Sequence, residues 1–408
     1  MGFRITTNMM MSTYRFNLMN STNRLSDASE KVQTQRNFNS YAEDPAAASQ
    51  AFRLRRQWCQ TSSQLANTDT TYNKFHTAWT NLGGVINDLS DANGRVSGIR
   101  GVSGPTAEAR KALALVLRET ADSVVESMNQ KVGEQFIFAG NDQLNVPFSW
   151  NDDHTVLYYR GINVGAGAVK EPDTTTNPEP DWAAKGIKTD KYGVPQIPDG
   201  YVLTDDEQAW MDYYNDQADK QKLDIMSKEQ LNLDLGMGLK EDENGKLING
   251  SAFDSALRGI SFLNYGIDKN GDSNCLPMVM RELADVFQAW DEDIDPQGYD
   301  PNQAGPSAQG LSASELQAKA DRLLDKLNAA QKHTTEKYVE LDAKSAFLKS
   351  NSSRLSTEVT NLNEQVLDVE QINMADAITQ LSWDNMCYNA ALKIGTQLLS
   401  QSLIDYMR

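Results

Sequence analysis

Apolar residues recur at every seventh position near the start of the chain. Met11, Leu18, Leu25 and Val32 form this series, and Tyr14 and Ala28 occupy the intervening offsets. Positions three and four apart lie on one face of an α-helix, so the spacing predicts an amphipathic helix of about four heptads. A single helix cannot cover such a stripe, and we therefore expect it to pair with a partner helix.

A second and longer helix is predicted to begin at Asp44 and Pro45. Asp is a good N-cap, and Pro is tolerated at the first helical position because its missing N–H would be unpaired there. Two series with a spacing of seven follow. The first consists of Ala51, Trp58, Leu65, Tyr72, Trp79 and Ile86, and the second of Leu54, Thr61, Thr68, Phe75, Leu82 and Leu89. We interpret their aromatic members as helix-packing residues rather than as a cofactor site.

The sequence next indicates a helix end, a third helix and a short strand. Gly101, Gly104 and Pro105 are predicted to end the long helix, and Thr106 to open the next. The apolar members of that third helix are Leu113, Leu117, Val124 and Met128. The segment 135–139 then reads as a strand that ends in a turn.

The last quarter of the chain repeats the pattern of the first. Its series of seven consists of Leu341, Leu348, Leu355, Leu362 and Val369, preceded by Leu316, Leu323, Leu327 and Ala330. A final helix is predicted from about Met374 to the end, with an apolar face formed by Ile378, Leu381, Leu392, Leu398, Leu399, Leu403 and Ile404. We expect the first and last helices to pair in antiparallel orientation. Their predicted assembly interface comprises Met11, Leu18, Leu25, Val32, Leu381, Leu392, Leu398, Leu399 and Leu403.

The middle of the chain differs in composition from both ends. Residues 148–310 contain 30 Asp and Glu against 13 Lys and Arg, which is −17 of the total net charge of −18, and nine of the twelve prolines. Hairpins are predicted at 148–159 and around Asn244-Gly245. Asp268, Asn270 and Asp272 have EF-hand offsets, but Ser273 and Val279 stand where that loop needs Gly and Glu, so a solvated turn is favoured.

These patterns predict a mainly α fold with an inserted α+β domain. A long helical stalk of bundle or coiled-coil type would form from the paired terminal segments, and a β-rich outer domain would project from it. The predicted divisions are an N-terminal helix at 1–43, a helical core at 44–147, an acidic outer domain at 148–310, the return of the core at 311–370, and a C-terminal helix at 371–408.

Several function classes receive no support from the sequence. No H-E-x-x-H, G-x-S-x-G or Walker pattern is present, and His76, His154 and His333 lie in unrelated segments, so we expect no catalytic, cofactor or metal site. The three cysteines, Cys59, Cys275 and Cys387, have no zinc-binding spacing. Acidity without a basic cluster argues against nucleic acid, and no apolar run is long enough to span a bilayer. The start of the chain lacks the apolar region of a cleaved signal peptide.

Four stretches resemble the flagellin family of bacterial flagella, and within it the hook-associated branch. They are the start Arg4-Ile5-Thr6-Thr7-Asn8-Met9-Met10, the run EDPAAASQA at 43–51, the run GEQFIFAG at 133–140 followed by Pro147-Phe148, and the tail. The tail contains NMADAITQLS at 373–382, AALKIG at 390–395 and SLIDYM at 402–407. The resemblance covers roughly the first 148 and last 100 residues.

The resemblance implies a structural protein of the flagellum that is not an enzyme. Terminal helices in this family form an inner tube, and subunits leave the cell through the flagellar export pathway without a cleaved signal peptide. The implied partners are copies of the chain in a ring, a hook-associated protein on the hook side, flagellin on the filament side, and an export chaperone at the C-terminal helix. Filament flagellin itself is the alternative within the family. An enzyme-bearing flagellin-like protein is a further alternative, although the missing H-E-x-x-H counts against it.

Overall fold

The computed structural model describes residues 7–101, 106–198, 200–238, 240–243, 252–289 and 310–406 of the 408-residue chain. The chain divides into two compact units. The first consists of Met1–Ala66 and Ser353–Arg408, and the second of Asn67–Ser352. Both are mainly helical in their described residues, and the few strands are short and antiparallel. The mainly α prediction is confirmed.

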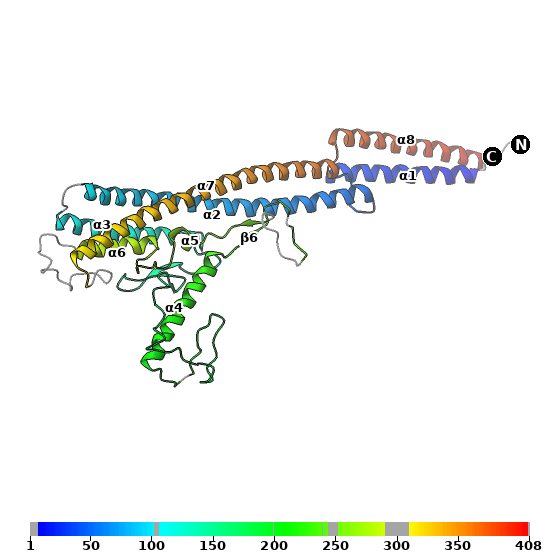
Figure 1. The fold of residues 1–408 in the computed structure, drawn as a ribbon. Helices are drawn as coiled ribbons and strands as arrows, with labels where there is room; N and C mark the ends of the chain where they lie inside the picture. The colour runs from blue at the N-terminus through cyan, green and yellow to red at the C-terminus, as the bar shows by residue number, and fades with distance from the viewer. Residues whose placement is uncertain are drawn as a thin grey trace. The chain divides into compact units, whose positions relative to one another are not determined.

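The helices run in the order α1 (Thr7–Thr34), α2 (Pro45–Gly101), α3 (Ala107–Met128), α4 (Asp205–Ser227), α5 (Gly259–Leu263), α6 (Leu276–Ala289), α7 (Ala313–Glu370) and α8 (Met374–Tyr406) (Figure 1). The strands are β1 (Lys131–Val132), β2 (Gln135–Phe136), β3 (Phe148–Trp150), β4 (Leu157–Tyr159), β5 (Ile162–Asn163), β6 (Asn232–Leu233) and β7 (Phe253–Asp254). They form a β1-β2 pair, a β3-β4-β5 sheet and a β6-β7 pair.

The helix ends follow the predicted capping chemistry. Asp44 Oδ1 accepts hydrogen bonds from the backbone N–H groups of Ala46 (3.1 Å) and Ala47 (2.9 Å), so α2 begins at Pro45 as predicted. The Thr106 hydroxyl accepts from Ala109 N at 3.3 Å and opens α3. The predicted domain divisions near 44 and 371 thus coincide with helix boundaries, whereas the two compact units divide inside α2 and α7.

The second unit is built around one apolar core. The α2 residues Phe75, Leu82 and Leu89, which belong to the second predicted series, are buried in it, and Leu341 and Leu348 enter it from α7. Helix α6 packs against α3 and contributes Val279, Leu283 and Phe287, among others. This core therefore crosses the predicted division at 148, because α6 comes from the acidic middle of the chain.

The segment 137–140 lies where the helices of this unit meet its small sheets. Ile137, Phe138 and Ala139 are fully buried, and only Gln135 and Phe136 of the predicted strand at 135–139 form one. Gly259 packs directly on this segment and donates its N–H to Phe138 O at 2.8 Å. A Cβ atom on Gly259 would lie 2.9 Å from that oxygen and 2.5 Å from the Phe148 ring, so no larger residue fits without rearrangement.

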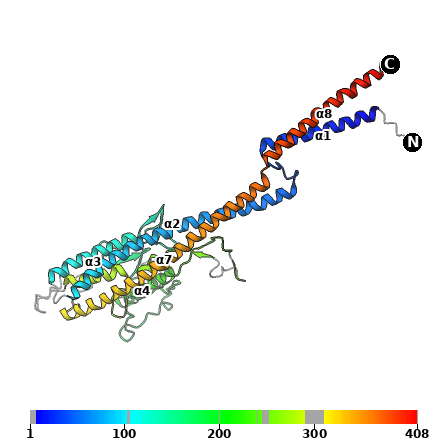
Figure 2. The same cartoon turned by 90° about the horizontal axis from the view of Figure 1, so that it is seen from above.

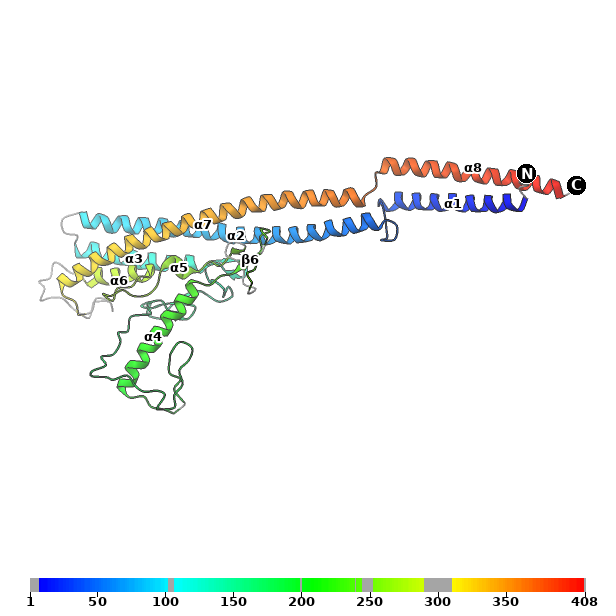
Figure 3. The same cartoon turned by 45° about the vertical axis from the view of Figure 1, so that its right-hand side comes forward.

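The inserted segment contains less strand than predicted. The hairpin of Phe148–Trp150 with Leu157–Tyr159 is confirmed, but no described strand there exceeds three residues, while α4 has 23. Helix α4 (Figure 3) begins with a capping box between Thr204 and Glu207. Its residue Trp210 belongs to a separate small apolar cluster that also includes Trp182. The description of this segment as β-rich is therefore wrong. The turn predicted at Asn244-Gly245 lies outside the described residues.

Candidate assembly surfaces

Helices α1 and α8 of the first unit lie side by side as an antiparallel hairpin (Figures 1 and 2). Alternate spacings of three and four give the least exposed positions of α1, namely Met11, Tyr14, Leu18, Ser21, Leu25, Ala28 and Val32. On α8 the corresponding positions are Ala377, Leu381, Asp384, Tyr388, Ala391 and Gly395. The predicted pairing of the first and last helices is confirmed, and its seam on α1 has the predicted register.

The seam on α8 uses smaller residues than the sequence suggested. Ala377, Ala391 and Gly395 supply half of it. Gly395 lies against the Tyr14 ring, since a Cβ atom there would be only 2.0 Å from Tyr14 Oη. Small residues on α8 therefore make room for the large side chain of α1, an arrangement that a search for leucine series does not detect.

The predicted assembly residues consequently divide into three groups. Those on α1, together with Leu381, are half-buried in the hairpin. Leu392 is 39% exposed, because it follows Ala391 by one residue and so points about 100° away from the seam. The side chains of Leu398, Leu399 and Leu403 lie outside the described residues. Whether any of these residues acts in assembly stays a prediction.

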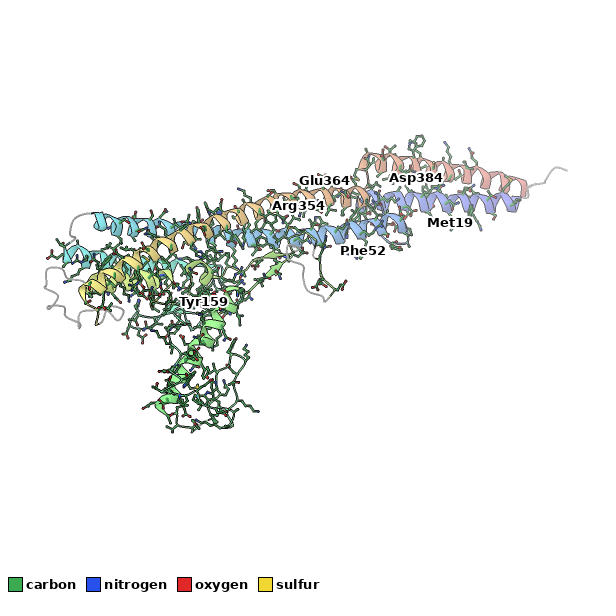
Figure 4. The ribbon with its side chains drawn as sticks, in the orientation of Figure 1. Met19, Phe52, Tyr159, Arg354, Glu364 and Asp384 are labelled. Carbon is green, nitrogen blue, oxygen red and sulfur yellow. The ribbon has the colours of Figure 1, made fainter. Side chains whose placement is uncertain are left out.

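The hairpin carries a second set of apolar residues on its outside. On α1 the exposed ones are Met9, Met10, Phe16 and Met19, and on α8 they are Met374, Ile378, Trp383, Met386, Leu392 and Ile394 (Figure 4 labels Met19). Phe16 is 64% and Trp383 62% exposed. An apolar helix surface of this extent normally lies against other protein, and two helices cannot cover both sides of each other.

One charged side chain interrupts the seam of the hairpin. Asp384 of α8 is buried, and its Oδ2 atom accepts a hydrogen bond from Gln380 Nε2 at 2.9 Å on the same helix. Because a buried carboxylate without a cation is unfavourable, a polar seam residue of this kind tends to fix register rather than add stability.

The loop between α1 and α2 caps the end of α7. Asn37 donates its backbone N–H to Glu370 O at 2.8 Å, and its side-chain amide donates to Val369 O (3.1 Å) and Gln371 O (2.9 Å). The backbone of Arg36 bridges to Gln371. These bonds satisfy carbonyl groups that every helix leaves free at its C-terminus, and they join the two interhelical loops of the first unit.

A groove of about 540 Å³ lies beside this joint. Its lining residues come from the end of α1 and the loop after it, from α2, and from the end of α7 with the residue that follows. They include Arg36, Arg55, Trp58, Leu367 and Glu370. Arg55 forms an ion pair with Glu370 across it, and the buried Trp58 Nε1 has no hydrogen-bond partner in the described part of the chain. The groove is thus lined in part by apolar side chains. It also contains one N–H group, Trp58 Nε1, that has no hydrogen-bond partner in the described residues.

The acidic turn at Asp268 to Asp272 is neutralised from within the second unit. Asp272 is buried, and Arg322 Nε lies 3.0 Å and Lys319 Nζ 3.8 Å from its carboxylate, while Lys326 Nζ lies 2.8 Å from Asp268. Three cations of α7 therefore pair with the two carboxylates of this turn, and the prediction of a solvated turn is wrong for the buried Asp272. In the described residues, no group of His, Cys, Asp and Glu side chains could hold a metal ion.

Glu282 of α6 adjoins the same cluster. Burial raises the pKa of its carboxyl to about 7, against the opposing influence of Lys319 and a hydrogen bond from Ser273 N. The three histidines are scattered as the sequence indicated, and the three cysteines are free. Among the described helices, none is sufficiently long and apolar to cross a bilayer.

Comparisons with known proteins show a distant structural similarity and no sequence match. No protein-family model matches the chain, and no curated protein matches it. Among solved structures, the chain is similar to a Vibrio parahaemolyticus protein whose own assignment as a flagellar hook-associated protein is provisional. The two are 13% identical with a TM-score of 0.47 over 81% of this chain and 100% of that one.

Proposed function

We propose that this chain is a structural subunit of the bacterial flagellum, hook-associated protein 3, which joins the hook to the filament. The observation that carries the proposal is the exposed apolar outside of the α1–α8 hairpin. The first unit makes up less than a third of the chain but contains 13 of the 24 large apolar residues that are exposed in the described part. An assembly of several copies would bury them.

The resemblance of the terminal stretches to the flagellin family supports a place for this chain in the flagellum. Its EDPAAASQA run spans the loop and N-cap that begin α2, and its IFAG run forms the buried segment 137–140. Its AALKIG run ends at Gly395, the residue on which Tyr14 packs. The matching residues thus lie at positions where the fold depends on them, which is less expected of a chance similarity.

In this proposal the hairpins of neighbouring copies pack together in a ring. A hook-associated protein binds on the hook side, and flagellin polymerises on the filament side. Before assembly, an export chaperone covers the apolar surface of α8. The protein lies outside the cell, is exported without cleavage of a signal peptide, and has a mechanical rather than an enzymatic role with no cofactor.

Deletion of the gene tests the proposal. We expect hooks without filaments, with flagellin monomers released into the medium, and restoration of filaments by the gene supplied on a plasmid. Electron microscopy of the cells and analysis of the medium give both results. Normal filaments on the deletion strain would contradict the proposal. Sheared filaments composed mainly of this chain would indicate filament flagellin instead.

A further inference from the structure

The two chain ends that make up the first unit carry opposite net charges. Residues 1–66 contain eight Lys and Arg against four Asp and Glu, and residues 353–408 contain three against seven. The N-terminal part is therefore +4 and the C-terminal part −4. The two charges cancel, so the net charge of the whole unit is zero and does not show that its two parts differ in charge.

Little of this charge is neutralised inside the unit. Arg55 and Glu370 form the ion pair that links the two ends in the described residues, while Arg354 binds Glu358 on its own helix at 3.1 Å. The acidic residues near α1 are occupied in part by capping, since Asp44 caps α2. Among the described residues, most of the charged side chains face solvent, and Asp384 is the buried exception.

Two pairs of exposed side chains supply part of the excess positive charge of residues 1–66 and of the excess negative charge of residues 353–408. Arg53 and Arg56 lie one turn apart on α2, and Glu364 and Asp368 lie one turn apart on α7. All four are exposed, and none has an ion-pair partner among the residues that the structure describes. Each pair adjoins an exposed apolar residue, Phe52 for the cations and Leu367 for the anions.

The charges are separated in space as well as in sequence. Helix α1 and the start of α2 lie along one side of the first unit, and the end of α7 and α8 lie along the other (Figures 1 and 3). Figure 4 labels Phe52 on the first side and Glu364 on the second. The unit therefore has a basic side and an acidic side, each with apolar residues.

We propose that the basic side of one copy binds the acidic side of a second copy. The inference rests on the self-association in the proposed function and specifies its direction. Two basic sides or two acidic sides would repel each other, so a two-fold contact of like faces is disfavoured. A contact between unlike faces leaves the other face of each copy free, and repetition generates a ring or a helical array.

Sedimentation of the full chain tests the inference without requiring the flagellar role. At an ionic strength of about 0.01 M, where charges act over about 30 Å, we expect the wild-type chain to self-associate, and at about 1 M we expect weaker association. Arg53→Glu with Arg56→Glu makes both residue pairs acidic, and Glu364→Lys with Asp368→Lys makes both residue pairs basic. Each double variant alone should associate at least about tenfold more weakly.

Sedimentation of a mixture of the two double variants tests the inference most directly. In one variant both residue pairs are acidic and in the other both are basic, so each pair meets an opposite charge on the other variant, and the equimolar mixture should recover association in alternating order. Lys170→Glu with Lys188→Glu is the matched control, because it changes the charge equally at exposed positions of the second unit and should leave association unchanged.

Three outcomes would overturn the inference: a monomeric wild-type chain at low salt, variants that associate as the wild type does, or a mixture as weak as its components. None of these outcomes predicts the phenotype of the deletion strain. The proposed function would therefore still be tested separately by that deletion. Recovery in the mixture supports the contact between unlike faces.

Discussion

Leu82, Leu117 and Leu283 of the second unit have no exposed surface, whereas Phe16 and Trp383 of the first unit are mostly exposed. Both units are helical, and both follow a spacing of seven residues. In the second unit, α2, α3, α6 and α7 surround one core, so each apolar stripe has several neighbours. In the described part of the α1–α8 hairpin each helix packs on the other, and the apolar residues on the outside are exposed.

The largest effect on stability should come from the core of the second unit. Leu283→Ala removes a fully buried side chain from α6, and we expect the free energy of unfolding to fall by about 2–5 kcal/mol. Met19→Ala on the outside of α1 should change it by no more than about 0.5 kcal/mol. Urea denaturation followed by circular dichroism measures both. Similar losses for the two variants would contradict the contrast between the units.

The sequence predicted the helices well because their seams are regular. The starts of α2 and α8 were predicted at Asp44-Pro45 and at about Met374, where the structure has them, and the heptads of α2 and α7 locate the core. The α8 seam was less predictable, because it consists partly of Ala and Gly, whereas the predicted apolar face consisted of Leu and Ile. Leu392 was therefore predicted on the wrong face of the helix.

Other features depend on contacts between distant parts of the chain. The cap that Asn37 provides for α7 joins residues more than 300 positions apart, and no local pattern indicates it. Helix α4 could have been found, because Thr204 and Glu207 have the spacing of a capping box. The cations that neutralise Asp272 come from α7, so the acidic turn could not be interpreted from its own residues.

A pH-dependent effect should also be confined to the second unit. Burial raises the folded-state pKa of Glu282 from 4.5 to about 7, so its contribution favours folding below pH 4.5 and is lost as the pH rises to 7. Glu282→Gln removes the ionisable group, so the free energy of unfolding should no longer fall between pH 4.5 and pH 7. At pH 8 it should be higher than that of the wild type by roughly 3 kcal/mol at most.

Glu340 provides a control of opposite sign. Hydrogen bonds from Lys344 and Lys337 lower its pKa to about 2, so its contribution is present above pH 4.5 and is lost as the pH falls toward 2. Glu340→Gln should therefore weaken the fold at neutral pH but not at pH 2. Unfolding curves from pH 2 to pH 8 distinguish the two variants. An unchanged pH profile for Glu282→Gln would rule out the role of Glu282.

A smaller effect is expected in the hairpin. Gly395→Ala places a Cβ atom against the Tyr14 ring, which must then move, and we expect a loss of about 1–3 kcal/mol in the pairing of α1 with α8. Tyr14→Ala in the same chain removes the clash and should recover part of that loss, which a double-mutant cycle measures. Limited proteolysis reports the opening of α1 and α8. Additive effects of the two substitutions would show that the contact does not matter.

The outside of the hairpin tests the central claim most directly. Met19→Ser with Trp383→Ser replaces two exposed residues, so the free energy of unfolding should change by no more than about 0.5 kcal/mol per site. Val202→Ser with Ile225→Ser changes exposed apolar residues of the second unit to the same degree and serves as the control. The measurement is the number of filaments per cell in a deletion strain that expresses each variant. The account predicts few or no filaments with the hairpin variant and normal filaments with the control. Normal filaments with the folded, exported hairpin variant would contradict it.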